Sequence, residues 1–416
     1  MKGFRVNLLL VPASYPHPGA EWAGAFNERS AIALRDIVDH LQVLSPTPYA
    51  PRFLSFNARW KAHLLAPKNQ VRNGIRVHRP AYPRIPGCLQ AFWPTTAAYL
   101  FSRRVASRLH KDVGFDALLS FDLASAGGLA WRLGRYLGVP ACGWATGSDM
   151  RRDVNHGIGR SVRKTLQNLD VVFYQSQELR ELAARLLDTN PEALSNERHI
   201  VQARGVKGPS TWPSAGVRQS VRAALGLCDL HTVVLYVGRI SRQKGLFGLV
   251  EGFTRVGLTR PQLALVLVGS RPGQDETAEL TRQIGSNSGL SNHVRIVPGC
   301  SPEKIWDYLS AADIFAFPSF EEGMPNSLIE ALLAGLPCVA FGIPCVREIL
   351  QSGRALIDVT PYDFSEFWHA LLTLVSDPAL QRKIGERGRA IANERFSIEQ
   401  NMRAVVDRVS RLTTTG

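Results

Sequence analysis

Short runs of apolar residues alternate along this chain with longer segments whose apolar residues recur at helical spacing. The apolar runs lie at residues 5–11, 41–45, 74–80, 116–121, 139–146, 170–176 and 199–205, and then at 232–238, 264–269, 294–299, 313–319, 337–342 and 354–359. Segments of helical pattern separate them, as at residues 28–38 and 161–169. Near-continuous apolar strands that alternate with helices are typical of parallel sheets covered on both faces. Two such series predict an α/β protein of two doubly wound, Rossmann-like domains.

The boundary between the two domains is expected where Gly, Pro and Ser accumulate, at residues 207–228. This linker separates an N-terminal domain at 1–206 from a C-terminal domain at 229–396. Two domains are also what the usual domain size predicts for a chain of 416 residues. Residues 397–416 have a helical period and predict a last helix on the outside, which can pack back on the N-terminal domain. Ligands of open α/β sheets bind beyond the carboxyl ends of the strands, so we expect the site in a cleft where the two domains face each other.

Charge is distributed unevenly between the two halves. The formal net charge is +14, and residues 1–228 hold 30 Lys and Arg against 15 Asp and Glu. No acidic residue occurs between Asp39 and Asp112, where large apolar residues alternate with basic ones. The basic residues of this window are Arg52, Arg59, Lys61, Lys68, Arg72, Arg76, Arg79, Arg84, Arg103, Arg104, Arg108 and Lys111. Such a surface attracts phosphate on anionic lipid or nucleic acid, although a solvated basic face without a partner explains it as well.

Composition places the chain among cytoplasmic proteins. The chain is 45% hydrophobic and 20% charged, and no window approaches 18 uninterrupted apolar residues. The apolar N-terminus is broken at Asn7 and ends at Pro12, so it predicts a first buried strand rather than a signal peptide. None of the six cysteines forms a C-x-x-C pair, and we expect buried, reduced thiols rather than disulfides or a metal site.

The strand at residues 232–238 runs directly into a loop with two cations. Arg239 and Lys244 follow the strand, and Gly238 and Gly245 flank the loop. A guanidinium binds phosphate oxygens as a fork and an ammonium adds a mobile point charge, so the loop suits a diphosphate. A solvent-exposed basic loop is the alternative.

The stretch FEEGMPNSLIEALLAG, residues 320–335, places carboxylates around the start of a predicted helix. Pro near its start and Gly near its end are the usual helix signals, and the first backbone N–H groups favour a bound anion. Glu322 lies just outside this anion site, and Glu330 lies about one turn inside the helix. Because carboxylates accept hydrogen bonds from hydroxyls, a diphosphate here with a sugar at each end describes a nucleotide sugar. Taken singly, Glu330 is also explained as a surface acid and Glu322 as a favourable charge at a helix start.

With its E-x7-E spacing, this stretch resembles the signature of the retaining family-4 glycosyltransferases, which have the GT-B fold. Further segments resemble that family in the same order. They are GWATGSD at 143–149, DVVFYQSQEL at 170–179, IVQARGV at 200–206, the Gly-Arg…Lys-Gly loop at 238–245, LVLVGS at 265–270, residues 294–319, and GIPCVREIL at 342–350. The likeness is strong from about residue 165 to residue 400 and looser before that.

The resemblance implies a donor, a reaction and a set of site residues. The donor is a nucleotide diphosphate-sugar, such as a UDP or GDP sugar, and the sugar is transferred with retention and without a metal or other cofactor. Glu322 contacts the donor sugar, Glu330 the ribose, and Arg239 with Lys244 the departing diphosphate. The remaining donor-binding positions are Gly238, Ser270, Gly323, Met324, Pro325, Asn326 and Ser327.

The N-terminal half departs from the family pattern at one place. Many members have a His at the end of the fourth strand of the N-terminal domain, whereas this chain has Phe121 beside Asp122. The imidazole contact is therefore either missing or supplied by Asp122 as the catalytic residue. His17, His78 and His156 are nearby substitutes, although a lone His is more often structural or on the surface. Gly24, Ala25 and Asp149 match the family's N-terminal loops and are expected near the donor.

The acid-free basic region at residues 43–111 lies in the domain that binds the acceptor in this family. We therefore expect a lipid-linked or anionic glycan intermediate of the cell envelope as acceptor, as in lipopolysaccharide or exopolysaccharide synthesis, and peripheral attachment to the inner face of the membrane. The alternatives are a nucleotide-sugar epimerase or a synthase on the same fold, a non-catalytic homologue, and a basic nucleic-acid-binding protein. No nucleic-acid recognition motif is visible, so a nucleic-acid partner is not expected.

Overall fold

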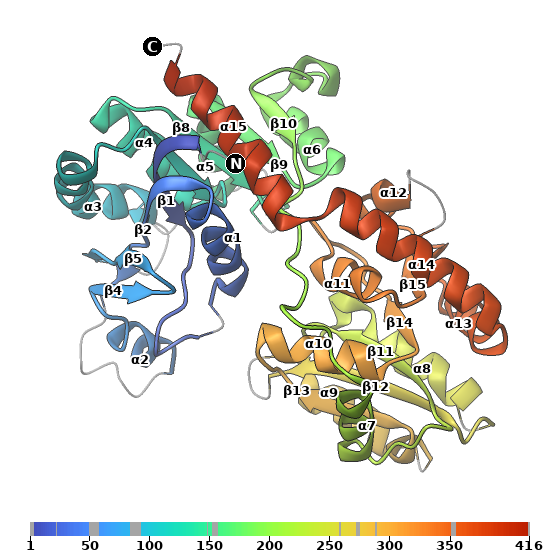
Figure 1. Cartoon of the computed structure of the whole chain (residues 1–416). Helices are drawn as coiled ribbons and strands as arrows, with labels where there is room; N and C mark the ends of the chain where they lie inside the picture. Colours follow the sequence, from blue (N-terminus) through green and yellow to red (C-terminus); the bar gives the residue numbers. More distant parts are fainter. Residues whose placement is uncertain are drawn as a thin grey trace. The chain divides into compact units, whose positions relative to one another are not determined.

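The protein is described here by a computed structural model (Figure 1), which covers residues 4–21, 23–49, 58–83, 93–147, 149–151, 157–257, 259–271, 275–287, 289–350 and 355–414. The chain divides into two compact units. Unit 1 comprises Met1–Gly205 together with Ile398–Gly416, and unit 2 comprises Val206–Ser397. Each unit is a sheet covered by helices, as the alternation of strand and helix patterns predicts.

Unit 1 contains an eight-stranded sheet in the order β10-β9-β8-β7-β1-β2-β5-β4. The strands are β1 (Phe4–Pro12), β2 (Val38–Leu44), β4 (Asn69–Arg72), β5 (Ile75–His78), β7 (Ala117–Phe121), β8 (Ala141–Ala145), β9 (Val171–Tyr174) and β10 (His199–Val201). All neighbours are parallel except β4 and β5, which form a hairpin through Asn73 and Gly74, both with positive φ. Strands β3 (Thr47–Pro48) and β6 (Ala81–Tyr82) pair separately. The strand order reverses between β1 and β7, which places a ligand crevice at their carboxyl ends.

The helices of unit 1 cover both faces of this sheet. They are α1 (Ala25–Arg35), α2 (Ala58–Leu64), α3 (Trp93–Val113), α4 (Ala126–Leu137), α5 (Gly157–Asn168), α6 (Gln177–Leu187) and α15 (Ile398–Thr414). Leu9 of β1 faces a core with α3 to α6, whereas its neighbours Leu8 and Leu10 face a second core with α1 and α15. This alternation follows from the two-residue period of a strand.

Helix α15 brings the end of the chain back to unit 1. Its apolar residues recur every three to four positions, and they are almost completely buried. They are Ile398, Met402, Val405, Val406 and Val409. Because they share a core with Leu8 and Leu10 of β1, residues 398–414 complete one face of the unit 1 sheet.

Unit 2 contains a six-stranded sheet in the order β13-β12-β11-β14-β15-β16, with every pair parallel. Its strands are β11 (Thr232–Val237), β12 (Leu263–Ser270), β13 (Val294–Pro298), β14 (Ile314–Phe317), β15 (Cys338–Phe341) and β16 (Ile357–Val359). Its helices are α7 (Ala215–Ala224), α8 (Leu246–Gly257), α9 (Thr277–Gly285), α10 (Pro302–Ala311), α11 (Asn326–Ala334), α12 (Pro344–Leu350), α13 (Phe364–Ser376) and α14 (Pro378–Arg395). The strand order reverses between β11 and β14, so the expected crevice of unit 2 lies at the carboxyl ends of these two strands.

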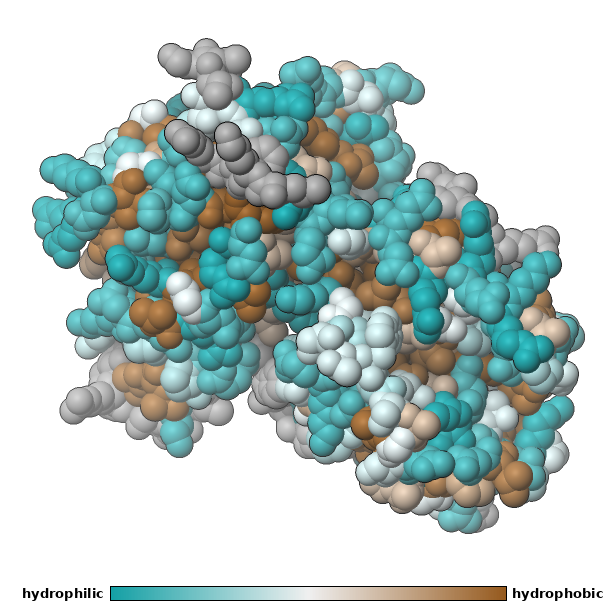
Figure 2. All heavy atoms as spheres, viewed as in Figure 1, coloured by the Kyte–Doolittle hydropathy of each residue, from teal (hydrophilic) through white to brown (hydrophobic). Residues whose placement is uncertain are grey.

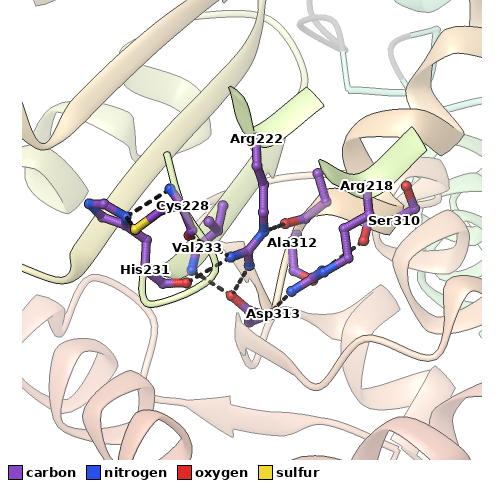
Figure 3. Close-up of polar contacts among 9 residues, drawn as sticks. Arg218, Arg222, Cys228, His231, Val233, Ser310, Ala312 and Asp313 are labelled. Atoms are coloured by element: carbon purple, nitrogen blue, oxygen red, sulfur yellow. Dashed lines mark hydrogen bonds and ion pairs between the residues drawn. The ribbon is translucent and has the colours of Figure 1, made fainter. Parts of the chain in front are cut away.

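The segment predicted as a linker, residues 207–228, instead belongs to unit 2 and contains α7. Arg222 of α7 is 2% exposed, and its guanidinium donates to the carbonyls of Ala311, Cys228 and His231 and to Asp313 (Figure 3). Arg218 reaches the other oxygen of Asp313. The sequence of this helix has no apolar stripe, because two arginines anchor it instead. Its Gly, Pro and Ser content therefore predicts a loop.

Two further expectations from the sequence concern membrane-spanning helices and thiols. No helix among the described residues is long and apolar enough to cross a membrane, and Figure 2 shows hydrophilic residues over most of the face in view. Cys142, Cys338 and Cys345 are buried thiols that form no disulfide, as predicted. Cys228 is free but exposed, so the prediction of a buried thiol is wrong there, because the residue lies in a loop after α7. Cys88 lies outside the described residues.

Candidate active site

The loop after β11 is shaped by two glycines. Gly238 has φ 152°, and a Cβ there would lie 2.5 Å from the hydroxyl of Tyr236. Gly245 has φ 71°, and a Cβ there would lie 2.0 Å from the carbonyl oxygen of Pro318, which follows β14. Only glycine permits this approach. The turn at residues 242–245 therefore rests directly on the chain leaving β14.

The loops after β11 and β14 are joined by an ion pair. Nζ of Lys244 contacts Oε1 of Glu322, and Oγ of Ser319 donates to the same carboxylate oxygen at 3.1 Å. The side chains of Lys244 and Glu322 are 14% and 19% exposed. The structure thus brings together two predicted site residues, one for the diphosphate and one for the sugar, at the carboxyl ends of β11 and β14.

Two further hydrogen bonds hold the same loops together. The side-chain amide of Gln243 donates to Glu321 at 3.0 Å, and the backbone N–H of Phe320 donates to the carbonyl of Gln243 at 3.1 Å. The ring of Phe320 stacks on Tyr362 with 4.3 Å between centroids. The positions of Lys244 and Glu322 are therefore fixed by backbone and side-chain contacts on both sides of their ion pair.

Helix α11 starts at Asn326, next to this ion pair in the chain. Pro325 precedes the helix, Gly335 ends it with φ 78°, and the first-turn amides have no carbonyl partner within the helix. Gly323, Met324 and Ser327 are half-buried and Asn326 is exposed. Glu330 is only 6% exposed. That burial removes the alternative that Glu330 is an ordinary surface acid.

The other predicted residues of unit 2 flank the same strand end. Arg239 is exposed, and no described residue hydrogen-bonds its guanidinium. Its carbonyl accepts from the hydroxyl of Tyr236 at 3.0 Å. Burial, and then the negative charge of Glu322, raise the pKa of Tyr236, so this hydroxyl stays protonated and can donate. Ser270 is buried, and a Cβ on its neighbour Gly269 would lie 2.3 Å from the carbonyl oxygen of Gly238.

In unit 1, Asp122 directly follows β7 and has φ 117°, a conformation that is unusual for a residue other than glycine. Its Oδ1 accepts from the backbone N–H of Ser125 at 2.6 Å and of Ala126 at 3.1 Å, so it caps α4. Burial, and then the negative charge of Asp149, raise the pKa of Asp122 to about 6. The described residues provide no hydrogen bond to its second oxygen, Oδ2, which leaves this atom available to a ligand.

Asp149 connects the loops after β7 and β8. It is 2% exposed, and its carboxylate accepts from the backbone N–H groups of Leu123, Thr146 and Gly147. The hydroxyl of Thr146 adds a fourth donor. This carboxylate is therefore occupied by the protein itself and supports the shape of the loops.

The N-terminal turn of α1 lies at the same sheet edge. Gly24 has φ 76°, and a Cβ there would lie 2.2 Å from the carbonyl oxygen of Ser14, while Ala25 begins the helix. Of the histidines named as substitutes, His17 accepts from the N–H of Gly19 and His78 contacts Asn69 and Gln42. His156 lies outside the described residues.

Sequence reasoning missed Arg204 of unit 1. Arg204 is 4% exposed and stacks on Phe121, the residue at the expected histidine position, with 4.0 Å from its Cζ to the ring centroid. Its Nη1 donates to Oδ1 of Asn27, 177 residues away. The only sequence signal was a basic residue at the end of the strand pattern at 199–205, and such a residue is ordinary at a strand end.

Comparisons with known proteins relate this chain to glycosyltransferases. The sequence model of the family "Glycosyl transferases group 1" matches residues 217–391, which lie in unit 2. The chain is 26% identical over 380 residues to the "Putative teichuronic acid biosynthesis glycosyltransferase TuaC" of Bacillus subtilis (strain 168), covering 87% of this chain and 90% of that protein. It is 30% identical over 245 residues to the "Alpha-maltose-1-phosphate synthase" of Mycolicibacterium smegmatis, covering 56% of this chain and 61% of that protein.

Solved structures show the same fold. Sucrose-phosphate synthase from Thermosynechococcus elongatus superposes with a TM-score of 0.76 at 20% identity, over 99% of this chain and all of that one. Anabaena Alr3699/HepE in complex with UDP and glucose superposes with a TM-score of 0.73 at 20% identity, over 98% of this chain and all of that one. These neighbours are GT-B enzymes, and two doubly wound units are the architecture predicted from the sequence. Residues 217–391 thus match the group 1 glycosyltransferases, and the chain has the GT-B fold.

Proposed function

We propose that this glycosyltransferase moves a sugar from a nucleotide diphosphate-sugar to a glycan, with retention of the anomeric configuration and without a metal. The observation that carries the proposal is the ion pair of Lys244 with Glu322 at the reversal point of the unit 2 sheet. The family match over residues 217–391 includes both residues. The neighbour HepE, which was solved with UDP and with UDP-glucose, supports a nucleotide sugar as donor.

The diphosphate is assigned to the cations after β11 and to the start of α11. Arg239 is exposed with no described partner, so it can turn toward a phosphate without breaking a contact. Lys244 exchanges part of its contact with Glu322 for a phosphate oxygen. The backbone N–H groups of Ser327 and Leu328 at the start of α11 donate to the other oxygens, since the N–H of Asn326 donates to the carbonyl of Met324. These groups stabilise the negative charge that develops on the leaving diphosphate, which is the role that a metal has in other transferases.

The two carboxylates take the two ends of the donor. Glu322 lies beside Lys244 and accepts hydrogen bonds from the transferred sugar, and its negative charge also stabilises an oxocarbenium-like centre. Glu330 is buried in α11, and a buried carboxylate is positioned firmly enough to select a ribose. Ser270, Gly238, Gly323, Pro325, Asn326 and Ser327 complete the donor site in this proposal.

The acceptor is proposed to be a lipid-linked or acidic glycan of the cell envelope, approached at the inner face of a membrane. The relative named for teichuronic acid biosynthesis supports an acidic glycan. The basic window at residues 43–111 supports a phosphate-bearing surface, but part of its charge is internal. Arg72 pairs with Glu21 and Glu28, and Arg79 is buried against backbone carbonyls.

Three of the cations that remain exposed lie on α3, whereas Lys61, Lys68 and Arg76 are exposed on other elements. Arg104, Arg108 and Lys111 are exposed on this helix, as are the apolar side chains of Leu100 and Phe101. Basic and apolar side chains that share one exposed helix suit the interface of an anionic membrane. We therefore assign the membrane contact to α3 rather than to the whole basic window.

The test is calorimetric titration of the full chain with UDP, GDP, ADP and UDP-glucose, followed by NMR of the product anomer. The proposal requires one nucleotide to bind, its sugar form to be consumed only with an acceptor, and the product to keep the anomeric configuration of the donor. Conversion of the free nucleotide sugar without any acceptor would identify an epimerase instead. Inversion at the anomeric carbon would remove the retaining mechanism.

A further inference from the structure

Arg204 follows β10 and contacts residues at the ends of β7 and β8 in unit 1. Residues 202–204 leave β10 and pass the end of β8, since the carbonyl of Gln202 accepts from the indole N–H of Trp144 at 3.1 Å. The guanidinium stacks on Phe121 and has its Cζ 5.4 Å from the ring centroid of Trp144. Its Nη1 donates to Asn27 at 2.9 Å. A cation fixed by a ring on its face and an amide at one nitrogen has a defined orientation.

The rest of this guanidinium has no hydrogen-bond partner. Nε and Nη2 are both buried, and neither has a hydrogen-bond partner in the part of the chain that the structure describes. These two nitrogens form one edge of the planar group, and their N–H bonds point in nearly the same direction, as in the paired contacts that arginine makes to two oxygens. Buried donors without partners cost free energy, and a protein that keeps two of them on one edge is suited to a ligand that satisfies both.

The charges around Arg204 decide which oxygens fit. Asp149 and Asp122 act on Arg204 electrostatically, and burial lowers the pKa of Arg204 to about 9. Asp149 already supplies one negative charge to balance the guanidinium, and Asp122 adds a second when it is ionised. A further carboxylate or phosphate would meet two like charges, whereas hydroxyl oxygens are neutral and can also donate to Oδ2 of Asp122.

We propose that the Nε–Nη2 edge of Arg204, with Oδ2 of Asp122, binds a pair of neighbouring hydroxyls on a substrate sugar. Arg204 donates to the two hydroxyl oxygens, and one hydroxyl donates to Asp122. Arg204 is thus a substrate-binding residue that the resemblance to the family does not assign, in a chain with phenylalanine where many members have histidine. The inference rests on the proposed function for the sugar, and it adds the residue and the kind of contact.

The sugar reaches Arg204 past Phe26. Phe121 and Trp144 are buried, but Phe26, whose ring centroid lies 5.4 Å from Cζ of Arg204, is 49% exposed. Phe26 is the second residue of α1, directly after the Gly24 turn. Because exposed side chains change rotamer within nanoseconds, we assign the approach of the ligand to the side of Arg204 on which Phe26 lies.

The test uses the full chain with Met or Lys at position 204, and calorimetry with four probes. UDP measures the nucleotide site, UDP-glucose adds a donor sugar, octyl β-glucoside supplies a neutral acceptor-like sugar, and UDP-glucuronate supplies a carboxylate. We expect Arg204→Met to leave the Kd for UDP within twofold and to weaken UDP-glucose or octyl glucoside at least tenfold. A loss of affinity for UDP-glucose would show that Arg204 binds the donor sugar, and a loss of affinity for the glucoside would show that it binds the acceptor. Arg204→Lys should lose nearly as much, because one ammonium cannot make the paired contact.

Arg198→Met is the matched control. Arg198 also lies in unit 1, but its Nε and Nη2 donate to the carbonyls of Leu169 and Leu166, so the substitution should leave all four affinities within twofold. Equal affinities of wild type and Arg204→Met for both UDP-glucose and the glucoside would overturn the inference, as would failure of the wild type to bind either sugar more tightly than background. A loss of affinity confined to UDP-glucuronate would show that Arg204 binds a carboxylate rather than a pair of hydroxyls. Absence of any nucleotide binding by the wild type contradicts the proposed function, while the glucoside still reports on Arg204.

Discussion

Lys244 and Glu322, which are 78 residues apart in the chain, form an ion pair between the loops that leave β11 and β14. The pair is mostly buried, and its carboxylate also accepts from Ser319. A cation held in this way is already in place before an anionic ligand arrives, so little side-chain entropy remains to be lost on binding. In the proposed donor site, the same pair keeps the carboxylate beside the point where the sugar is joined to the diphosphate.

Replacing Glu322 by Gln should separate binding from transfer. The amide retains the size of the side chain and its contact with Ser319, but it loses the charge that stabilises an oxocarbenium-like centre. We expect transfer to fall by roughly 10²-fold or more, while nucleotide affinity stays within a few-fold. Glu321→Gln is the control, because Glu321 contacts Gln243 at the outer side of the loop. Normal turnover of the Glu322→Gln enzyme would remove this residue from the mechanism.

Gly245→Ala should damage both stability and the site. Its Cβ would lie 2.0 Å from the carbonyl oxygen of Pro318, and φ is 71°. The strained conformation and the clash together should cost about 1–3 kcal/mol in the free energy of unfolding and displace the adjacent Lys244. Gly285→Ala is matched to it, because a Cβ there meets no atom within 4 Å. Urea denaturation of both variants, with UDP titration, would show whether the effect is specific to position 245.

The strands and the unit 2 site were accessible from sequence because each depends on neighbouring residues. A strand of apolar residues, the glycine that ends it, and the cations that follow it are contiguous in residues 232–245, and so are β14 and the start of α11. The α/β architecture and the positions of Arg239, Lys244 and Glu322 beside strand ends follow from such local patterns. The resemblance to the family then gave these elements their place, because the matching segments follow in the same order along the chain.

Other features depend on residues that only the fold brings together. Arg204 meets Asn27 across 177 residues, and Arg72 meets Glu21 and Glu28, so an acid-free window in the sequence is not acid-free in space. Local composition predicts a linker at helix α7, because the residue that anchors the helix through Arg222, Asp313, is more than 90 residues away in the chain. Contacts of this kind need the topology of the sheet, which local composition does not contain.

Arg222→Met should destabilise unit 2 strongly. The guanidinium is 2% exposed and donates to three carbonyls and to Asp313, so its loss leaves buried carbonyl acceptors unpaired and leaves Arg218 as the remaining guanidinium at Asp313. Breaking a buried pair in this way costs about 3–5 kcal/mol. Gln219→Met, on the exposed side of the same helix, should change the free energy of unfolding by less than about 0.5 kcal/mol. Equal stability of the two variants would show that α7 is not anchored by Arg222.

The stability of the Asp122→Asn variant relative to wild type should increase as the pH rises. The pKa of Asp122 is raised from 3.8 to about 6 by burial and then by Asp149. The folded state therefore holds the proton more tightly than the unfolded state, and wild-type stability falls as the pH rises from about 4 to about 6. Asn does not ionise, and its side-chain oxygen can still cap α4. We expect the unfolding free energy of the variant, relative to wild type, to increase by on the order of 2 kcal/mol between pH 4 and pH 7.5. The same difference at both pH values would show that the carboxyl ionises equally in both states.

Binding of the chain to vesicles should depend on two cations of α3. Each Lys or Arg near an anionic surface contributes ~1 kcal/mol, so reversing the exposed pair Arg104 and Arg108 to Glu should weaken binding to phosphatidylserine-containing vesicles by at least about 30-fold. Arg382 and Lys383, an exposed basic pair on α14, provide a control with the same change in net charge, and reversing them should have little effect. Binding should also weaken between 50 and 300 mM salt, since screening shortens the reach of these charges. Equal losses from both double variants would assign the attraction to net charge rather than to α3, and salt-independent binding would exclude the electrostatic mechanism altogether.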